Sequence, residues 1–186
     1  MLNGFKHKAV LLIALLWCSS SIGSQICLSE TEIPPTTPTS QFTQHSNGTV
    51  TDTATKLMWM RCSVGLTWDG TTCLGEPSEH NWESALEVAK GTNFANYHDW
   101  RLPNIKELTS IVEEACHNPA INLTVFPETV VYAPDENGFP LAPWLGYWTS
   151  THYSNDRALH VKFQNGFYTF YYKRDTAYRV RLVRGG

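Results

Sequence analysis

Residues 158–172 carry the clearest structural signal in the chain: Ala-Leu-His-Val-Lys-Phe-Gln-Asn-Gly-Phe-Tyr-Thr-Phe-Tyr-Tyr. Two apolar-rich runs flank Asn165 and Gly166, and Asn-Gly is the strongest short hairpin signal because both central residues of a type I′ turn have positive φ. The sequence therefore predicts an antiparallel hairpin with a two-residue turn, in which Gln164 lies opposite Phe167. The other predicted pairs are Phe163 with Tyr168, Val161 with Phe170, and Leu159 with Tyr172.

Because side chains alternate across a strand, this register predicts two different faces. The face predicted to be core consists of Leu159, Val161, Phe163, Tyr168, Phe170 and Tyr172. The mixed face, predicted to meet water or a partner, consists of His160, Lys162, Gln164, Phe167, Thr169 and Tyr171. Residues 147–151 and 178–183 are predicted to flank the hairpin in the same antiparallel sheet.

Two helices are predicted upstream of this sheet. The first has Asn81 as its N-cap and Gly91 as its stop, and its apolar positions follow helical spacing. They are Trp82, Ala85, Leu86 and Ala89. In the second, Asn104 caps the helix and Glu107 reaches back to it. Its buried stripe is Ile105, Leu108, Ile111, Val112 and Ala115. Two short strands at residues 49–51 and 57–61, joined by a turn, complete an α+β class.

The first 24 residues show the pattern of a secretory signal peptide. Lys6 and Lys8 precede an apolar run at 9–17, which is followed by Cys18 and small residues. The run is about half the roughly 20 residues that a helix needs to cross a bilayer, so we expect cleavage and no transmembrane segment in the mature chain. Lipid attachment at Cys18 is the alternative, and the bulky Trp17 before it fits that pattern poorly.

The rest of the chain divides into a spacer and one domain. The 186 residues are 42% hydrophobic and 17% charged, which suits one domain with a single core. Residues 25–45 are rich in Pro and Thr and predict an extended spacer. The folded domain is expected over residues 46–186, with a long irregular loop at 117–146 that five prolines interrupt.

The cysteine count indicates two disulfides. Cleavage removes Cys18 and leaves four cysteines, an even number, in an exported chain. Of the three possible connectivities we favour Cys62–Cys73, which closes a short loop, and hence Cys27–Cys116. A zinc site is the competing interpretation, but no Cys-x-x-Cys or paired Cys/His spacing occurs.

Charge is distributed unevenly along the mature chain. The total is −3 with the leader, which argues against a nucleic-acid binder. Residues 25–140 hold five Lys and Arg against fifteen Asp and Glu, whereas residues 141–186 hold seven against two. The predicted sheet end is therefore basic.

Several segments together resemble the Lcl C-terminal domain family, named after the Legionella collagen-like adhesin. They are Thr51-Asp-Thr-Ala-Thr-Lys-Leu-Met-Trp-Met-Arg-Cys62, Asp99-Trp-Arg-Leu-Pro-Asn-Ile-Lys-Glu-Leu108, Asn118-Pro-Ala-Ile121, Gly146-Tyr-Trp-Thr-Ser150 and Arg181-Leu-Val-Arg-Gly-Gly186. The resemblance covers nearly all of residues 48–186. It implies a C-type-lectin-like fold, with two helices packed on antiparallel sheets and a long irregular loop region. It also implies a bacterial protein that is secreted or periplasmic.

The resemblance implies a binding function as well. The family's namesake is an adhesin whose C-terminal domain binds sulfated glycosaminoglycans. The Glu-Pro-Asn and Gln-Pro-Asp tripeptides of calcium-dependent lectins do not occur here, and the acidic run at 135–137 is a weak candidate for calcium. We therefore expect no metal and no cofactor.

The basic sheet end with its aromatic residues is the predicted ligand site, because Lys and Arg pair with sulfate or carboxylate while rings stack on sugars. The candidate residues are Trp144, Tyr147, Arg157, His160, Lys162, Phe167, Tyr171, Lys173, Arg174, Arg179 and Arg181. The competing interpretation is that Arg181 and Arg184 form ion pairs with the acidic half and that the aromatic residues are core.

We expect a non-enzymatic adhesion module whose partner is an anionic polysaccharide. The alternative is a cell-envelope domain that docks another cell-surface protein. An enzyme is less favoured: oxidases on lectin-like scaffolds need reactive cysteines, and all four here are predicted to be bridged. No catalytic histidine pattern is discernible either.

Overall fold

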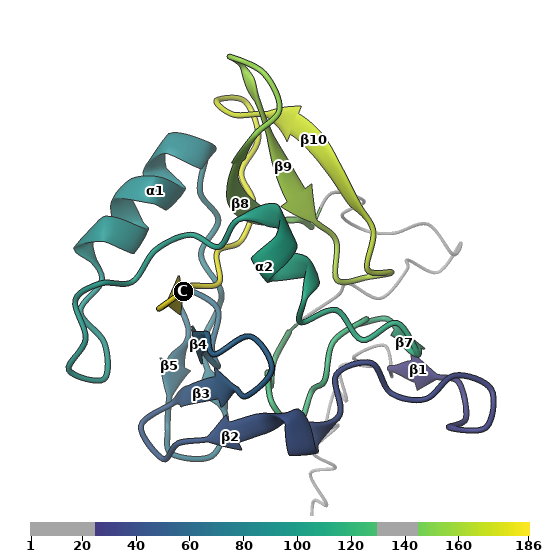
Figure 1. The fold of residues 1–186 in the computed structure, drawn as a ribbon. Helices are drawn as coiled ribbons and strands as arrows, with labels where there is room; N and C mark the ends of the chain where they lie inside the picture. Colours follow the sequence, from purple (N-terminus) through teal and green to yellow (C-terminus); the bar gives the residue numbers. More distant parts are fainter. Residues whose placement is uncertain (1–24, 130–144) are drawn as a thin grey trace, which may run out of the picture.

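The computed structural model describes residues 25–129 and 145–186 (Figure 1). The predicted signal peptide with Cys18, the acidic run at 135–137 and Trp144 lie outside these residues. In the described part the chain is a mixed α+β domain with two α-helices and several antiparallel sheets. This mixed class agrees with the sequence prediction.

A four-stranded antiparallel sheet forms the lower left of Figure 1. Its strands, in spatial order, are β11 (Val183–Arg184), β4 (Met58–Met60), β3 (Thr49–Asp52) and β2 (Phe42–Gln44). The predicted strands at 49–51 and 57–61 and the turn between them are confirmed. The Asp52 carboxylate holds this turn, because it accepts hydrogen bonds from the Ala54 N–H at 2.9 Å and the Thr55 hydroxyl at 2.7 Å.

A three-stranded antiparallel sheet forms the top of Figure 1. It consists of β8 (Tyr147–His152), β9 (Arg157–Val161) and β10 (Tyr168–Tyr172), with β9 in the centre. The flanking strand predicted at 147–151 is confirmed. The one predicted at 178–183 is wrong: this segment makes single bridges at Tyr178 and Arg179 and then enters the other sheet as β11.

The hairpin is present, but its register differs from the prediction by two residues. Tyr168 lies opposite Val161, and the last pair before the tip is Lys162 with Phe167. The type I′ turn is wrong, since only Gly166 of the Asn-Gly pair has a positive φ, at 78°. Tertiary contacts explain the longer tip: Phe163 is buried in the main core, 5.1 Å from the Tyr147 ring.

The first helix follows the sequence closely. Helix α1 (Trp82–Gly91) begins after Asn81, whose side chain accepts a hydrogen bond from the Ser84 N–H, as predicted. The buried residues Trp82, Ala85 and Ala89 face inward, and α1 packs against β8.

The second helix is shorter than predicted. Helix α2 (Ile105–Thr109) has the capping box between Asn104 and Glu107 that the sequence predicts, but it ends near Ser110. The Thr109 hydroxyl donates to a carbonyl of the preceding turn, which competes with continued helical bonding. Ile111, Val112 and Ala115 are buried as predicted, although they lie in the turn that follows the helix.

The N-terminal segment, residues 25–41, lies along the domain as a strap. Its strand β1 (Ile26–Cys27) pairs with β7 (Cys116–His117), and it ends in a 3-10 turn, η1 (Thr39–Gln41). The residues predicted as a spacer are thus strapped to the domain. Phe42 lies in the core, so the folded unit begins before residue 46.

Both predicted disulfides are present. Cys27 bonds to Cys116, and Cys62 bonds to Cys73. The second bridge lies beside a small hairpin of β5 (Thr67–Trp68) and β6 (Cys73–Leu74).

Two hydrophobic clusters form the core. The first joins the four-stranded sheet to α2 and the hairpin tip, around Trp59, Leu108 and Phe126. The second lies between α1 and the three-stranded sheet, around Trp148 and Tyr178. One face of the three-stranded sheet is therefore covered by α1 and the chain near Tyr178.

Candidate functional site

The structure buries part of the hairpin face that the sequence assigned to water. Ala158 and His160 are fully buried, because α1 and Tyr178 cover this side of the sheet. The face predicted to be core carries Tyr168 and Tyr172, which are 59% and 43% exposed. The assignment of the two faces is therefore wrong for His160, Tyr168 and Tyr172. Val161 and Phe163 are buried as predicted, and Gln164, Phe167 and Thr169 are exposed as predicted.

Five of the predicted ligand-binding residues are buried and do not form a surface. They are Tyr147, His160, Lys173, Arg179 and Arg181. The structure therefore does not assemble the predicted basic face as a ligand surface. Much of the positive charge in the last 46 residues lies inside the domain.

Arg181 is a structural residue at the junction of the two sheets. Its guanidinium donates to the carbonyls of Met60 and Arg61 and to the hydroxyls of Ser63 and Thr129. It also lies 5.0 Å from the Phe126 ring centroid. Burial lowers the pKa of this guanidinium from its ordinary value. Its described hydrogen-bond partners are neutral oxygens. The alternative prediction, an ion pair with a carboxylate, is therefore not what the described residues form. Arg184 does form the expected ion pair, with Asp99 at 2.7 Å.

Lys173 is also fixed by internal contacts. Its ammonium donates to His152 Nδ1 at 2.8 Å and to the carbonyls of Ser154 and Asn155 at 3.0 and 3.1 Å. It lies 4.5 Å from the Trp82 ring centroid. These contacts use all three N–H donors of a lysine, so Lys173 connects the β8–β9 turn to α1.

His160 lies among aromatic rings. Its ring is 4.3 Å from that of Tyr178 and 5.9 Å from that of Trp148. Neither ring nitrogen has a hydrogen-bond partner among the described residues, and the Tyr178 hydroxyl also has none there. Burial lowers the pKa of His160 to about 3, with a smaller contribution from the charge of Lys162. The side chain is therefore neutral at pH 7 and cannot bind an anion as a cation.

The opposite face of the hairpin carries an exposed row of aromatic side chains. We call Tyr153, Arg157, Tyr168, Phe170 and Tyr172 the exposed aromatic row. The three tyrosines are exposed, and Arg157 and Phe170 are half-buried between them. Tyr153 and Phe170 stack with their ring centroids 3.9 Å apart and their planes 8° from parallel. Tyr168, Phe170 and Tyr172 alternate along β10 and so share one face.

Arg157 supplies the positive charge of this row. Its guanidinium lies 4.6 Å from the Tyr172 ring centroid and 5.3 Å from that of Phe170. It donates one hydrogen bond, of 2.8 Å, to the Tyr172 hydroxyl. A guanidinium has five N–H donors, so Arg157 retains donors for a ligand while the two rings hold its plane in place.

The other predicted residues lie apart from one another. Phe167 is 72% exposed at the hairpin tip, and Lys162 is half-buried opposite it. Tyr171 is half-buried against the second core cluster. The Arg174 side chain is 88% exposed and lies 4.0 Å from Glu83. Of the predicted residues, only Arg157 belongs to the exposed aromatic row.

Sequence reasoning missed Tyr153, Tyr168, Phe170 and Tyr172 as surface residues. The alternation of side chains along β9 does contain one indication of this exposure. Arg157 continues the series of Leu159 and Val161, so it belongs to the face that was assigned to the core. A charged residue at that position indicates that this face meets water.

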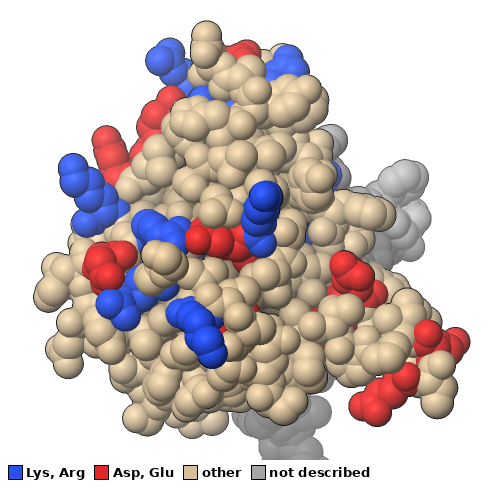
Figure 2. Space-filling model, viewed as in Figure 1, with Lys and Arg blue, Asp and Glu red and all other residues tan. Residues whose placement is uncertain are grey.

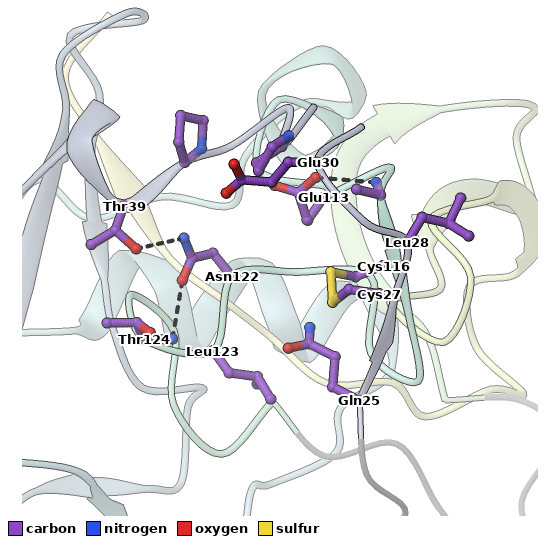
Figure 3. A pocket seen from close by; sticks show the side chains of 13 residues that line it. Gln25, Cys27, Leu28, Glu30, Thr39, Glu113, Cys116, Asn122, Leu123 and Thr124 are labelled. Carbon is purple, nitrogen blue, oxygen red and sulfur yellow. Dashed lines mark hydrogen bonds between the residues drawn. A yellow bond between two sulfur atoms is a disulfide. The ribbon is translucent and has the colours of Figure 1, made fainter. Parts of the chain in front are cut away.

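A separate pocket of about 420 Å³ lies between the strap and the chain after α2 (Figure 3). The Cys27–Cys116 disulfide forms part of its wall, together with Leu28, Pro35 and Leu123. Figure 2 shows acidic side chains around β1 and β7, and no Lys or Arg there on the face in view. The sequence did not predict this pocket, because it depends on how the strap lies on the domain.

The Glu113 carboxylate fixes the strap beside this pocket. It accepts hydrogen bonds from the backbone and hydroxyl of both Thr36 and Thr37, and from the Ala115 N–H. Burial raises the pKa of Glu113, but these hydrogen bonds outweigh it and lower the pKa overall. Asn122 adds hydrogen bonds to the Thr37 carbonyl and the Thr39 hydroxyl.

Residues 25–129 and 145–186 contain neither a metal-binding cluster nor a membrane-spanning helix. Within them, no group of three or more His, Cys, Asp or Glu side chains is placed to hold a metal ion. In the same residues, no helix has the length and hydropathy needed to span a bilayer.

The fold and its exposed aromatic surface describe a small, disulfide-bridged α+β domain. The model of the Lcl C-terminal domain family matches residues 48–184, and the chain belongs to this family. Searches of curated proteins and of solved structures found no match.

Proposed function

We propose that the protein is an exported, non-enzymatic adhesion module that binds anionic glycans on the exposed aromatic row. The supporting observation is the position of Arg157, whose charged plane is held over Phe170 and Tyr172 on an open surface. Family membership supports an adhesin-associated domain. We include in this proposal a C-type-lectin-like arrangement of the two helices and sheets.

The chemistry of the row fits a sugar that carries sulfate or carboxylate groups. Arginine recognises both groups through pairs of parallel N–H···O bonds. Flat aromatic faces offer stacking surfaces for the apolar sides of sugar rings, and Tyr hydroxyls add hydrogen-bonding groups. A flat row suits a linear chain better than a single small molecule, which would require a concave pocket.

Export is supported by the two disulfides, which persist in oxidising compartments outside the cytoplasm. The signal peptide proposed for residues 1–24 agrees with this location. With the four cysteines at 27, 62, 73 and 116 bridged, none of them is a free thiol for oxidase chemistry.

Heparin binding at low salt tests the proposal. The wild-type protein should be retained on heparin and released as salt rises, because ionic contacts are screened. Arg157→Gln should weaken binding by about 10-fold, which corresponds to one charged hydrogen-bonding contact. Lys90→Gln removes the same charge from the exposed end of α1 and should leave affinity within about twofold.

Two outcomes would overturn the proposal. One is the absence of heparin retention at low ionic strength. The other is equal weakening by Arg157→Gln and Lys90→Gln, which would indicate general charge attraction. Retention of an envelope protein by the same surface without heparin binding would favour the docking alternative.

A further inference from the structure

The two disulfides differ sharply in their access to solvent. Cys62 and Cys73 are 2% and 3% exposed. Cys27 is exposed and Cys116 is half-buried, and both line the 420 Å³ pocket that opens beside the strap (Figure 3). An attacking thiolate must reach a sulfur atom directly, so only the Cys27–Cys116 bridge is open to attack in the folded domain.

The segment that this bridge holds has few other attachments. Residues 25–35 pair with the domain through the two-residue strands β1 and β7 and through the Leu28 N–H, which donates to the Ala115 carbonyl at 2.8 Å. The Gln25 amide donates to the carbonyls of Pro119 and Ile121, both at 2.7 Å. Ile26, Leu28 and Ile33 are exposed and add no buried apolar contact of a core residue.

The next residues are held independently of the bridge. Thr36 and Thr37 are bonded to the Glu113 carboxylate, and Asn122 is bonded to Thr37 and Thr39. The strap therefore has a strong noncovalent attachment at residues 36–39 and a covalent one at Cys27. Opening the bridge would free the part of the strap that lies before residue 36.

We propose that Cys27–Cys116 is a thiol–disulfide exchange site that takes a dithiol reductant and releases residues 25–35. A thiolate of the reductant attacks Sγ of Cys27, the more exposed of the two residues, and Cys116 leaves as a thiolate that takes up a proton. The second thiol of the reductant then breaks the mixed disulfide, so that Cys27 becomes a thiol and the reductant a disulfide. Two electrons and two protons pass to the protein.

The charge around the pocket selects among reductants. Glu30 and Glu113 line it, and its described lining includes no Lys or Arg. An anionic thiol is repelled by such a surface, whereas a cationic one is attracted. The cationic thiol cysteamine should therefore reduce this bridge faster than the anionic thiol 2-mercaptoethanesulfonate. To remove the difference in intrinsic reactivity, the rate of each thiol with the protein is divided by the rate of the same thiol with a small uncharged disulfide.

Differential alkylation of the full-length oxidised protein tests the proposal. The folded protein is treated with dithiothreitol, quenched with an alkylating reagent, and the labelled cysteines are counted by peptide mass spectrometry. Cys27 and Cys116 should become labelled at least 10-fold faster than Cys62 and Cys73. Equal rates for the two pairs, or no labelling before global unfolding, would overturn the proposal.

Hydrogen exchange tests the release of the strap. On reduction, amides at 26–33 should exchange at least 10-fold faster, while those of Thr36 and Thr37 keep their protection. A Cys62→Ala/Cys73→Ala variant, if folded, should show the same reduction-dependent change, whereas Cys27→Ala/Cys116→Ala should exchange fast without reductant. Unchanged exchange at 26–33 after confirmed reduction would show that the bridge does not hold the strap.

Discussion

The Glu113 carboxylate accepts two hydrogen bonds from Thr37, one from the backbone N–H at 2.8 Å and one from the hydroxyl at 2.9 Å, across 76 positions of sequence. Thr36 makes the equivalent pair of bonds to the other carboxylate oxygen. One buried carboxylate thus satisfies two backbone amides of a segment with little regular structure. This contact therefore holds the strap against the turn that follows α2.

Glu113→Gln should destabilise the protein by about 2–3 kcal/mol. The amide has only one acceptor oxygen, and its NH₂ group would face N–H donors of the strap. Urea unfolding at pH 7 measures the change. Glu114→Gln is the matched control, because Glu114 is an exposed neighbour, and it should leave the free energy of unfolding unchanged within error.

The same contact predicts a dependence on acid pH. Because the pKa of Glu113 is lowered in the folded state, its contribution is fully present above the ordinary value of 4.5 and is lost as pH falls through the lower folded value. The difference in unfolding free energy between wild type and Glu113→Gln should therefore shrink below about pH 4.5. A difference that stays constant down to pH 3 would contradict this assignment.

His160 should make the domain sensitive to acid over a higher pH range. Its pKa is lowered from 6.5 to about 3 by burial, so the unfolded chain binds a proton that the folded chain excludes. The free energy of unfolding is then unaffected by His160 titration above about pH 6.5, and it falls as the pH decreases toward 3. The loss between pH 7 and pH 4 should be about 3 kcal/mol.

A non-titrating variant isolates this effect of His160. His160→Gln removes the titrating ring, so its unfolding free energy should fall less between pH 7 and pH 4 than that of wild type. The comparison is of slopes, and it stays informative even if the variant is less stable at pH 7. Identical slopes for both proteins would contradict the buried neutral histidine.

The hairpin shows how far local sequence signals can reach. Asn165 and Gly166 correctly indicate where the chain reverses, because that preference depends on the backbone alone. The register depends on what lies next to the tip: the Asn118 N–H donates to the Gln164 carbonyl at 2.8 Å, and Gly166 packs so closely on Val112 that a Cβ atom would lie 2.7 Å from its side chain. These partners are more than 40 positions away in the sequence.

The candidate site was also harder to predict because the burial of each charge depends on residues that are distant in the sequence. Composition correctly shows that the end of the chain is basic and aromatic, but it does not show which charges are buried. Arg181 is internal because carbonyls and hydroxyls from two separate segments, residues 60–63 and Thr129, surround it. By contrast, the Cys62–Cys73 loop and both helix N-caps depend on nearby residues and are correctly predicted. Once Cys62 and Cys73 are paired, Cys27 and Cys116 remain for the second bridge, which is also present.

Arg181→Lys should cost about 2–4 kcal/mol of stability, although the charge is kept. Lysine has a single nitrogen, which cannot reach the Ser63 and Thr129 hydroxyls together with the carbonyls of Met60 and Arg61. Thermal or urea unfolding measures the loss. Arg184→Lys is the control and should have little effect, because lysine can still pair with Asp99 at the surface. Equal losses would show that Arg181 has no special structural role.

Tyr168→Ala should weaken heparin binding by about 3- to 10-fold, which is the range for losing one aromatic stacking contact. Tyr168 is 59% exposed, so the substitution should leave the unfolding free energy nearly unchanged. Phe167→Ala is the matched control: Phe167 is the next residue and is 72% exposed, but strand alternation places it off the row. Its affinity should equal that of wild type in the same titration. If Phe167→Ala weakens binding and Tyr168→Ala does not, the ligand lies on the face that the sequence originally suggested, and the exposed aromatic row is not the site.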